Sequence, residues 1–333
     1  MTIGEIQQAL FQAIKLKLPE GGSVVDETAE LLEISTDSAY RRMRGEKTIS
    51  IDEFRILCKH FRLSADELLG FRKEGVTFAG SYLNSEHFDF KAYVQSVAQN
   101  LAFMNRFKER RFYYLCKDLP IFYHYHLQEI AAFKWFFWLN TYFQFPGFEK
   151  KKLRFEDHPA DIFEIEREVL DQYNQIPSVE IWNMENMNIF LRQIDFYRDA
   201  QLFESDQDIY RLYDAIGRLW NHLEEQARLG YKFRIDDPAG KPGGELKMYF
   251  NEVLLGDNNM LVEMDGERMA YVSHTTINFL VTKDKVFTEN MHRHIQNQIK
   301  RSTLISEVSE KERSRFFRII RERIENRKER LSV

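Results

Sequence analysis

The sequence predicts a mainly α-helical protein whose C-terminal part is α+β. Two observations predict this fold class. Apolar residues recur at helical spacing over most of the 333-residue chain, which is the pattern of amphipathic helices. Four short strand-like segments gather between residues 246 and 282, and an Asp-Gly pair separates two of them, as in a β-hairpin. Because helices and strands occupy separate runs of the chain, the order favours an α+β fold.

Residues 1–70 are expected to form an N-terminal domain of five helices. The first helix places apolar residues on one face and ends at the Pro- and Gly-containing segment 19–22. Ser50 and Ser64 each precede a glutamate by three residues, which is the spacing of a capping box. The expected helices are 3–18, 24–33, one from Ser35 or Thr36 to Gly45, and two that start at Ser50 and Ser64.

The segment 25–45 predicts a helix, a tight turn and a second helix. Ile34 is expected to fill the turn between them. The hydroxyl of Ser35 or Thr36 can accept the free backbone N–H groups at the start of the second helix. Gly45 follows that helix, at a position where a left-handed residue commonly ends a helix.

The second helix of this segment presents polar side chains away from its expected buried residues, Ala39 and Met43. Short polar groups, an aromatic ring and arginines on one helix suit contacts with base edges and phosphates in the DNA major groove. Residues 41–47 hold four basic residues and one acidic residue, although the chain has a formal net charge of −5. The candidate DNA-binding residues are Thr36, Asp37, Ser38, Tyr40, Arg41, Arg44 and Lys47.

Residues 23–70 resemble the helix-turn-helix of phage-repressor-like (XRE-type) DNA-binding domains. The resemblance rests on Ala29, Leu32, the pair Ile34-Ser35, the glycine that ends the second helix and the amphipathic helix that follows. It implies a lambda-repressor-like fold for this domain and binding to double-stranded DNA. The sequence departs from the family at Glu33, where the turn usually has glycine, and at Val25, where many members have a glutamine that contacts phosphate.

Residues 71–86 carry two glycines and no sustained periodicity, which predicts a linker. Residues 87–333 are expected to form an α+β domain for dimerisation or signal sensing. Its first part, 87–235, is predicted to be helical, with helices near 88–107, 120–143, 159–174, 178–203 and 206–229 and one strand at 111–116. Its second part is predicted to hold a short antiparallel sheet and closing helices, with strands at 246–255, 260–264, 267–273 and 276–282 and helices at 284–301 and 310–330.

The predicted helix 120–143 carries more large apolar residues than one buried face needs. Such a helix is either fully buried or part of an interface. Small helix-turn-helix domains overcome weak binding by forming dimers that contact two half-sites about one turn of DNA apart. We therefore expect a homodimer held together by the C-terminal domain.

A small-molecule effector is a further expectation. Ligand pockets are mostly apolar with a few convergent polar groups, so the pocket would lie where helix 120–143 meets the strands of 246–282. Tyr123, His126 and His274 are the polar candidates there. The alternative, which the sequence favours, is that all three are hydrogen-bonded core residues.

Catalytic, metal-binding and membrane-spanning patterns are missing from the sequence. No nucleophile, phosphate-binding or metalloprotease motif occurs, so we expect neither an enzyme nor a cofactor. His124 and His126 are two residues apart and do not face one another on a helix, which argues against a metal site. Cys58 and Cys116 lack metal or disulfide spacing, which indicates a reducing cytoplasm. The apolar stretch 130–145 is too short to span a bilayer.

These observations favour a cytoplasmic, sequence-specific, DNA-binding transcriptional regulator. One alternative is an effector or enzyme module carried by a helix-turn-helix domain. Another is an interaction protein whose N-terminal domain binds protein rather than DNA. Retention on DNA that weakens as salt rises would separate the last alternative from the other two.

Overall fold

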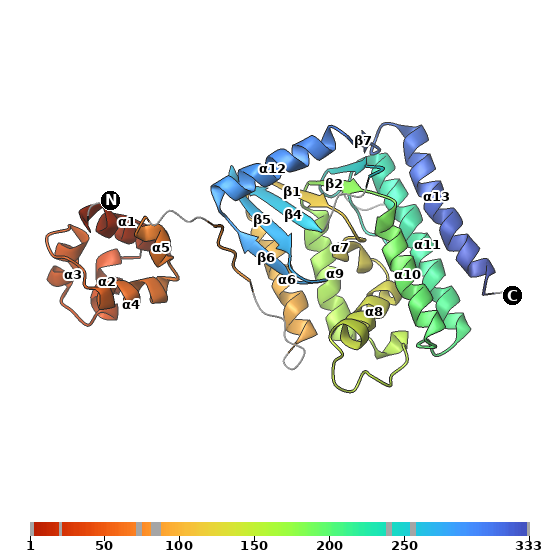
Figure 1. Cartoon of the computed structure of the whole chain (residues 1–333), viewed down its shortest axis with the longest axis horizontal. Helices are drawn as coiled ribbons and strands as arrows, with labels where there is room; N and C mark the ends of the chain where they lie inside the picture. Colours follow the sequence, from red (N-terminus) through yellow and green to blue (C-terminus); the bar gives the residue numbers. More distant parts are fainter. Residues whose placement is uncertain are drawn as a thin grey trace. The chain divides into compact units, whose positions relative to one another are not determined.

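The computed structural model describes residues 3–19, 22–70, 75–80, 88–237, 242–253 and 258–331. The chain divides into two compact units, Met1–Val76 and Thr77–Val333, here called the N-terminal and C-terminal units (Figure 1). The boundary falls within the segment 71–86 that the sequence predicts to be a linker. Each unit is described by itself.

The N-terminal unit is helical. Leu10, Ile14 and Leu57 are almost completely buried at its centre. Ser50 accepts a hydrogen bond from the Glu53 N–H, and the Glu53 carboxylate accepts one from the Ser50 N–H, which confirms the predicted capping box. The helices are α1 (Ile3–Lys15), α2 (Val24–Leu31), α3 (Thr36–Met43), α4 (Ile51–Phe61) and α5 (Ala65–Leu68).

The C-terminal unit is built on a seven-stranded mixed sheet in the order β6-β5-β4-β1-β2-β3-β7. The central pairs β1–β2 and β2–β3 are parallel, whereas the outer pairs are antiparallel. The predicted antiparallel pairing is confirmed for β4, β5 and β6. The predicted sheet is wrong in size, and β3 pairs with β2 and β7 rather than with β4. The strands are β1 (Arg110–Leu115), β2 (Ser178–Trp182), β3 (Leu246–Phe250), β4 (Asn259–Met264), β5 (Glu267–Ser273), β6 (Phe279–Thr282) and β7 (Thr303–Leu304).

The strand β2 corrects the prediction of a helix over 178–203. All five of its residues are buried, because β1 and β3 pair with it on either side and helices cover the sheet. Its sequence alternates polar Ser178 and Glu180 with apolar Val179 and Ile181, but the alternation lasts only five residues. A run this short is also compatible with the start of the helix that follows it, α10 (Glu185–Asp199).

Helices cover both faces of the sheet. Side chains such as Phe112 and Tyr114 point into the large core beneath α6 (Phe90–Met104) and α9 (Ala160–Asn174). The alternate residues, such as Tyr113 and Leu115, pack on the other face with Ile295 of α12 (Lys285–Ile299), which lies along β4 and β5 (Figure 1). The remaining long helices, α11 (Asp206–Leu229) and α13 (Glu310–Glu329), pack together, and the Trp220 indole donates to the Phe317 carbonyl at 2.9 Å.

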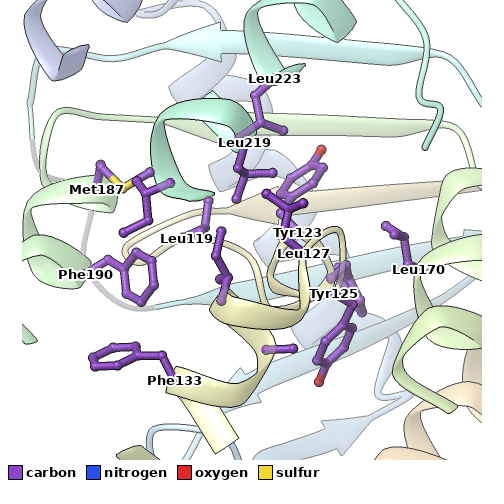
Figure 2. Packing of buried hydrophobic residues seen from close by; sticks show 14 of the residues in the cluster. Leu119, Tyr123, Tyr125, Leu127, Phe133, Leu170, Met187, Phe190, Leu219 and Leu223 are labelled. Carbon is purple, nitrogen blue, oxygen red and sulfur yellow. The ribbon is translucent and has the colours of Figure 1, made fainter. Parts of the chain in front are cut away.

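The predicted helix 120–143 is three segments rather than one. They are α7 (Ile121–His124), α8 (Gln128–Phe137) and a π-helical turn η1 (Trp138–Tyr142). Leu127 has extended backbone angles, which separates α7 from α8. Figure 2 shows Tyr123, Tyr125 and Leu127 of this connection packed in the core. No glycine or proline marks the break in the sequence, so tertiary packing overrides the local helical pattern.

Burial within the C-terminal unit accounts for the aromatic residues of this region. Phe133, Phe136 and Trp138 are at most 2% exposed, and the Phe133 ring contacts Phe190 of α10 with ring centroids 5.5 Å apart (Figure 2). The aromatic content of 120–143 therefore does not argue for an interface between two copies of the chain.

Residues 77–80 extend the edge of the sheet. Ala79 and Val281 of β6 exchange two backbone hydrogen bonds of 2.7 Å, and the Thr282 hydroxyl donates to the Thr77 carbonyl at 2.8 Å. This part of the predicted linker is thus paired to β6, whereas 71–74 and 81–86 lie outside the described residues. In the described part of the chain, every helix is too short or too polar to cross a membrane.

Candidate nucleic-acid interface

The chain makes a tight turn between α2 and α3. The Ser35 hydroxyl accepts the Ser38 N–H at 3.2 Å and so caps α3, as predicted. Glu33 has a positive φ of 54°, which costs a residue with a side chain about 1–2 kcal/mol relative to glycine. The tight turn that the sequence predicts is therefore made without the glycine usual at that position.

Most of the candidate DNA-binding side chains share the exposed side of α3 and the loop after it. Thr36, Asp37, Tyr40 and Arg41 are exposed on the helix. Arg44 and Lys47 follow it and are exposed as well. The exposed side of α3 together with this loop, residues 36–47, is called the α3 surface below.

The charges on the α3 surface are partly balanced. Glu46 lies 3.8 Å from the Arg41 guanidinium and 3.6 Å from that of Arg44. The Arg44 guanidinium also lies 4.6 Å from the centroid of the Tyr40 ring, a cation–π contact that holds both side chains against the helix. Exposed ion pairs of this kind contribute little free energy, so both arginines can exchange Glu46 for a phosphate.

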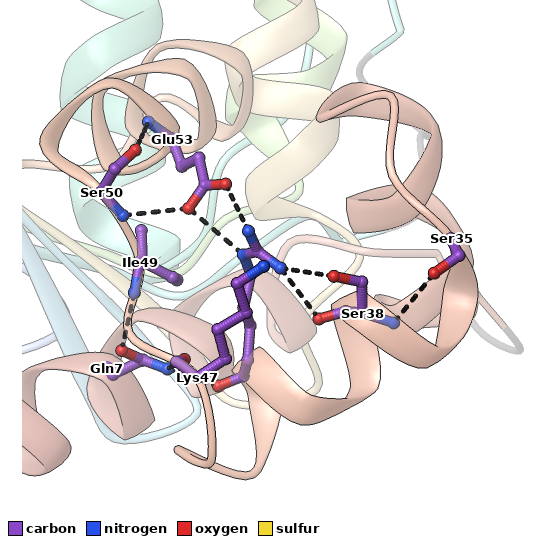
Figure 3. Close-up of polar contacts among 8 residues, drawn as sticks. Gln7, Ser35, Ser38, Lys47, Ile49, Ser50 and Glu53 are labelled. Carbon is purple, nitrogen blue, oxygen red and sulfur yellow. Dashed lines mark hydrogen bonds and ion pairs between the residues drawn. The ribbon is translucent and has the colours of Figure 1, made fainter.

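Arg42 is buried, although it belongs to the basic run 41–47. Its guanidinium donates to both carboxylate oxygens of Glu53, from Nη2 to Oε1 at 2.6 Å and from Nε to Oε2 at 3.2 Å (Figure 3). Nη1 of the same group donates to the Ser38 hydroxyl at 2.7 Å. The hydroxyl of Ser38 therefore has a partner inside the domain, and Arg42 contributes no charge to the α3 surface.

Gln7 of α1 fixes the loop that follows α3. Its side-chain amide donates to the carbonyls of Arg42 and Lys47 at 2.5 and 2.8 Å, and its Oε1 accepts the Ile49 N–H at 3.1 Å (Figure 3). The side chain is 6% exposed. The residues predicted for the site do not include Gln7, Arg42 or Glu53. Each of these side chains supports α3 or the loop after it through hydrogen bonds inside the unit. The Ser50–Glu53 capping box was the one sequence signal near them.

The candidate effector residues do not form one site. Tyr123 is buried and donates to the Glu180 carboxylate at 2.7 Å. His126 is buried beside His222, with ring centroids 4.8 Å apart, and burial, with a smaller effect of His222, holds its pKa well below the usual value. His274 is exposed in the connection between β5 and β6. Tyr123 and His126 are thus core residues, whereas His274 is exposed to solvent.

Glu180 of β2 is a buried carboxylate to which four side chains hydrogen-bond. The carboxylate is completely buried and accepts from the hydroxyls of Tyr123, Tyr173 and Ser178 and from the Trp182 indole, at 2.5 to 3.0 Å. Glu180 is not among the predicted site residues, because the segment 178–203 was expected to be helical, whereas Glu180 lies in β2. The four donors satisfy both oxygens of the buried carboxylate, which gives Glu180 a structural role in joining β2, α7 and α9.

A cavity of about 540 Å³ lies in the C-terminal unit between α6, the strands β4–β6 and the start of α7. Ile121 and Phe122 of the predicted helix 120–143 line one end of it. Tyr123, His126 and His274 are not among the described residues that line it.

Comparisons with family models, with curated proteins and with solved structures found no match for this chain. Among the described residues, no cluster of three or more His, Cys, Asp or Glu side chains could hold a metal ion.

Proposed function

We propose that this protein is a sequence-specific, DNA-binding transcriptional regulator in which α3 enters the major groove of double-stranded DNA. The observation that carries the proposal is the α3 surface. One short helix exposes Thr36, Asp37, Tyr40 and Arg41, while its buried side is fixed by the pair Arg42–Glu53. A helix held rigidly by its neighbours with polar and basic groups outward suits major-groove recognition.

The residues of the α3 surface have different proposed roles. Arg41 and Arg44 supply affinity, through guanine edges or phosphates. Thr36, Asp37 and Tyr40 set the base preference, because repressor-type helices contact bases with their N-terminal residues. Ser38 is left out of the contacts because its hydroxyl accepts from Arg42.

The C-terminal unit is proposed to dimerise the protein or to sense a signal. The support for a homodimer is the weak binding expected of one small helix-turn-helix domain, which two linked copies on adjacent half-sites overcome. We also propose a cytoplasmic location, because the chain has two cysteines and both are free thiols, as expected in a reducing compartment.

The proposal predicts that Arg41→Ala/Arg44→Ala weakens DNA binding. If one of the two makes a bidentate guanine contact, the loss is about 1–3 kcal/mol, or roughly 5- to 150-fold in affinity. Fluorescence anisotropy of the full-length protein, with a DNA fragment that it selects from genomic DNA, measures the change.

The matched control removes the same charge from another surface of the same unit. Arg55 and Lys59 are exposed on α4, so Arg55→Ala/Lys59→Ala changes the net charge equally and should leave specific binding nearly unchanged. Equal weakening by the two double variants would mean that only overall charge matters, and would remove α3 from the proposed interface.

A further inference from the structure

The cavity in the C-terminal unit is built by one row of the sheet facing one side of a helix. Tyr114, Met260, Tyr271 and Val281 are paired neighbours across β1, β4, β5 and β6, so their side chains lie on the same face. All four line the cavity. Opposite them lie residues of α6 at four-residue spacing, Ala92, Ser96, Asn100 and Met104, with Tyr93, Val97 and Leu101 beside them.

The size of this cavity sets it apart from packing defects. Protein interiors are packed about as densely as organic crystals, and their voids are rarely larger than a water molecule. A volume of about 540 Å³ lies in the range of sites for small organic molecules. The apolar atoms that line such a space lose dispersion contacts while it holds no partner. Ser96 and Asn100 line the cavity and are exposed, so a ligand can enter beside them.

The chemistry of the lining selects the class of ligand. Apolar side chains dominate, including Leu101, Phe112, Met260 and Ile277. The charged group among the described lining residues is Asp89, whose carboxylate already caps α6 by accepting the Ala92 N–H at 3.0 Å. The described lining residues include no Lys, Arg or His. An anionic ligand would therefore lose its hydration without gaining a counter-charge.

We propose that this cavity binds an uncharged, largely apolar small molecule. The phenol groups of Tyr114 and Tyr271 lie in the lining and can orient a polar atom of such a ligand by hydrogen bonding. Gly80 and Val281 also line it, so the ligand would lie against the strand pairing between residues 77–80 and β6. The inference does not depend on the DNA-binding proposal, because its test uses no DNA.

The test compares two fluorescent probes that differ by one charged group. N-phenyl-1-naphthylamine is uncharged, and 8-anilinonaphthalene-1-sulfonate adds a sulfonate to the same ring system. Titrated into the full-length protein, the uncharged probe is expected to bind saturably at one site per chain. The sulfonate is expected to bind at least about 10-fold more weakly, because its charge must be desolvated. No saturable binding of the uncharged probe, or equal binding of both, would overturn the proposal.

Variants that fill the cavity locate the probe. Val97→Trp on α6 and Val281→Phe on β6 occupy the space from opposite sides, and each should reduce probe affinity at least about 10-fold in a folded protein, as checked by circular dichroism. Phe103→Trp is the matched control on α6, because Phe103 is 44% exposed and lies outside the lining, and it should bind the probe as wild type does. Unchanged binding in whichever filling variants fold would place the probe elsewhere and contradict the assignment.

Discussion

Glu53 has two partners that together fix the position of α3. Its carboxylate accepts the Ser50 N–H at 2.9 Å, which caps α4, and accepts Arg42 Nη2 at 2.6 Å. The hydrogen bond from Arg42 is the largest of the effects that lower the pKa of Glu53 below its ordinary value of 4.5. The orientation of α3 thus depends on Glu53 of the next helix, α4, a residue that lies outside the α3 surface.

Glu53→Ala is therefore expected to destabilise the N-terminal unit by about 2–4 kcal/mol. The variant leaves the Arg42 guanidinium, which is 5% exposed, without its carboxylate, and the partial exposure of Glu53 moderates the cost. Native-state hydrogen exchange in α3 and α4 measures the change. Glu53→Gln keeps the side-chain length and an acceptor for Ser50, so it should lose less. Wild-type exchange rates in Glu53→Ala would show that the pair does not stabilise this unit.

Lys232 is a buried amine in the core of the C-terminal unit. Its Nζ donates to the Ile176 carbonyl at 2.5 Å and lies 3.7 Å from the centroid of the Tyr173 ring. Burial lowers the pKa of Lys232 from 10.5 to about 7, although the nearby charge of Glu180 acts in the opposite direction. The folded chain thus releases this proton at a lower pH than the unfolded chain.

This difference predicts that the contribution of Lys232 to the stability of the C-terminal unit grows as pH rises from about 7 to about 10.5. In that range the unfolded chain holds the Lys232 proton and the folded chain does not, so raising the pH favours the folded state. Urea unfolding monitored by tryptophan fluorescence reports on this unit, since all four tryptophans lie in it. Over this pH range the wild type should gain stability relative to Lys232→Met. Parallel curves for the two proteins would mean that Lys232 keeps an ordinary pKa.

At the scale of elements, the turn between α2 and α3 keeps a strained residue. Glu33 has φ 54°, a conformation that glycine adopts without the steric cost. Glu33→Gly is expected to stabilise the N-terminal unit by about 0.5–1 kcal/mol, after the extra chain entropy of glycine is subtracted. Hydrogen exchange in α2 and α3 measures this change in stability. Glu33→Ala is the control, because it removes the charge of the side chain and keeps the backbone strain. A Glu33→Gly variant no more stable than Glu33→Ala would argue against strain at this turn.

Elements with local signals were predictable from the sequence. The helix predicted near 206–229 is confirmed as α11, which Ser205 caps and Gly230 ends in a left-handed conformation. The turn, the cap and the exposed side of α3 follow from equally local patterns. The pairing of Arg42 with Glu53 does not follow from a local pattern, because a run of arginines does not show which side chain is buried.

Elements defined by tertiary contacts were not predictable in the same way. The strand β2 is buried on both faces and its alternation of polar and apolar residues lasts only five residues. The break at Leu127 has no turn residue. Both were therefore expected to lie within helices. The cavity depends on the register of four strands against α6. Its lining residues are scattered between Gly80 and Val281, a separation that no local pattern connects.

At the scale of the whole molecule, the chain combines a small helical unit with a larger α/β unit that begins at Thr77. Residues 77–80 are paired to β6 and also border the cavity through Gly80. A ligand there can influence DNA binding only if it binds two conformations of the protein with different affinities. Binding of DNA to the α3 surface and binding of an apolar molecule in the cavity can be measured separately, because the two sites lie in different units.

The central claim is that α3 selects the DNA sequence, and a selection from random DNA tests it most directly. The full-length wild-type protein and a Thr36→Ala/Asp37→Ala variant are each used to recover DNA at physiological salt, with Asp52→Ala on α4 as the control. The wild type and the control are expected to recover the same motif, arranged as two half-sites about one helical turn apart. The Thr36→Ala/Asp37→Ala variant is expected to recover a motif changed at one or two positions of each half-site. An identical motif from all three proteins, or none from the wild type, would contradict the claim.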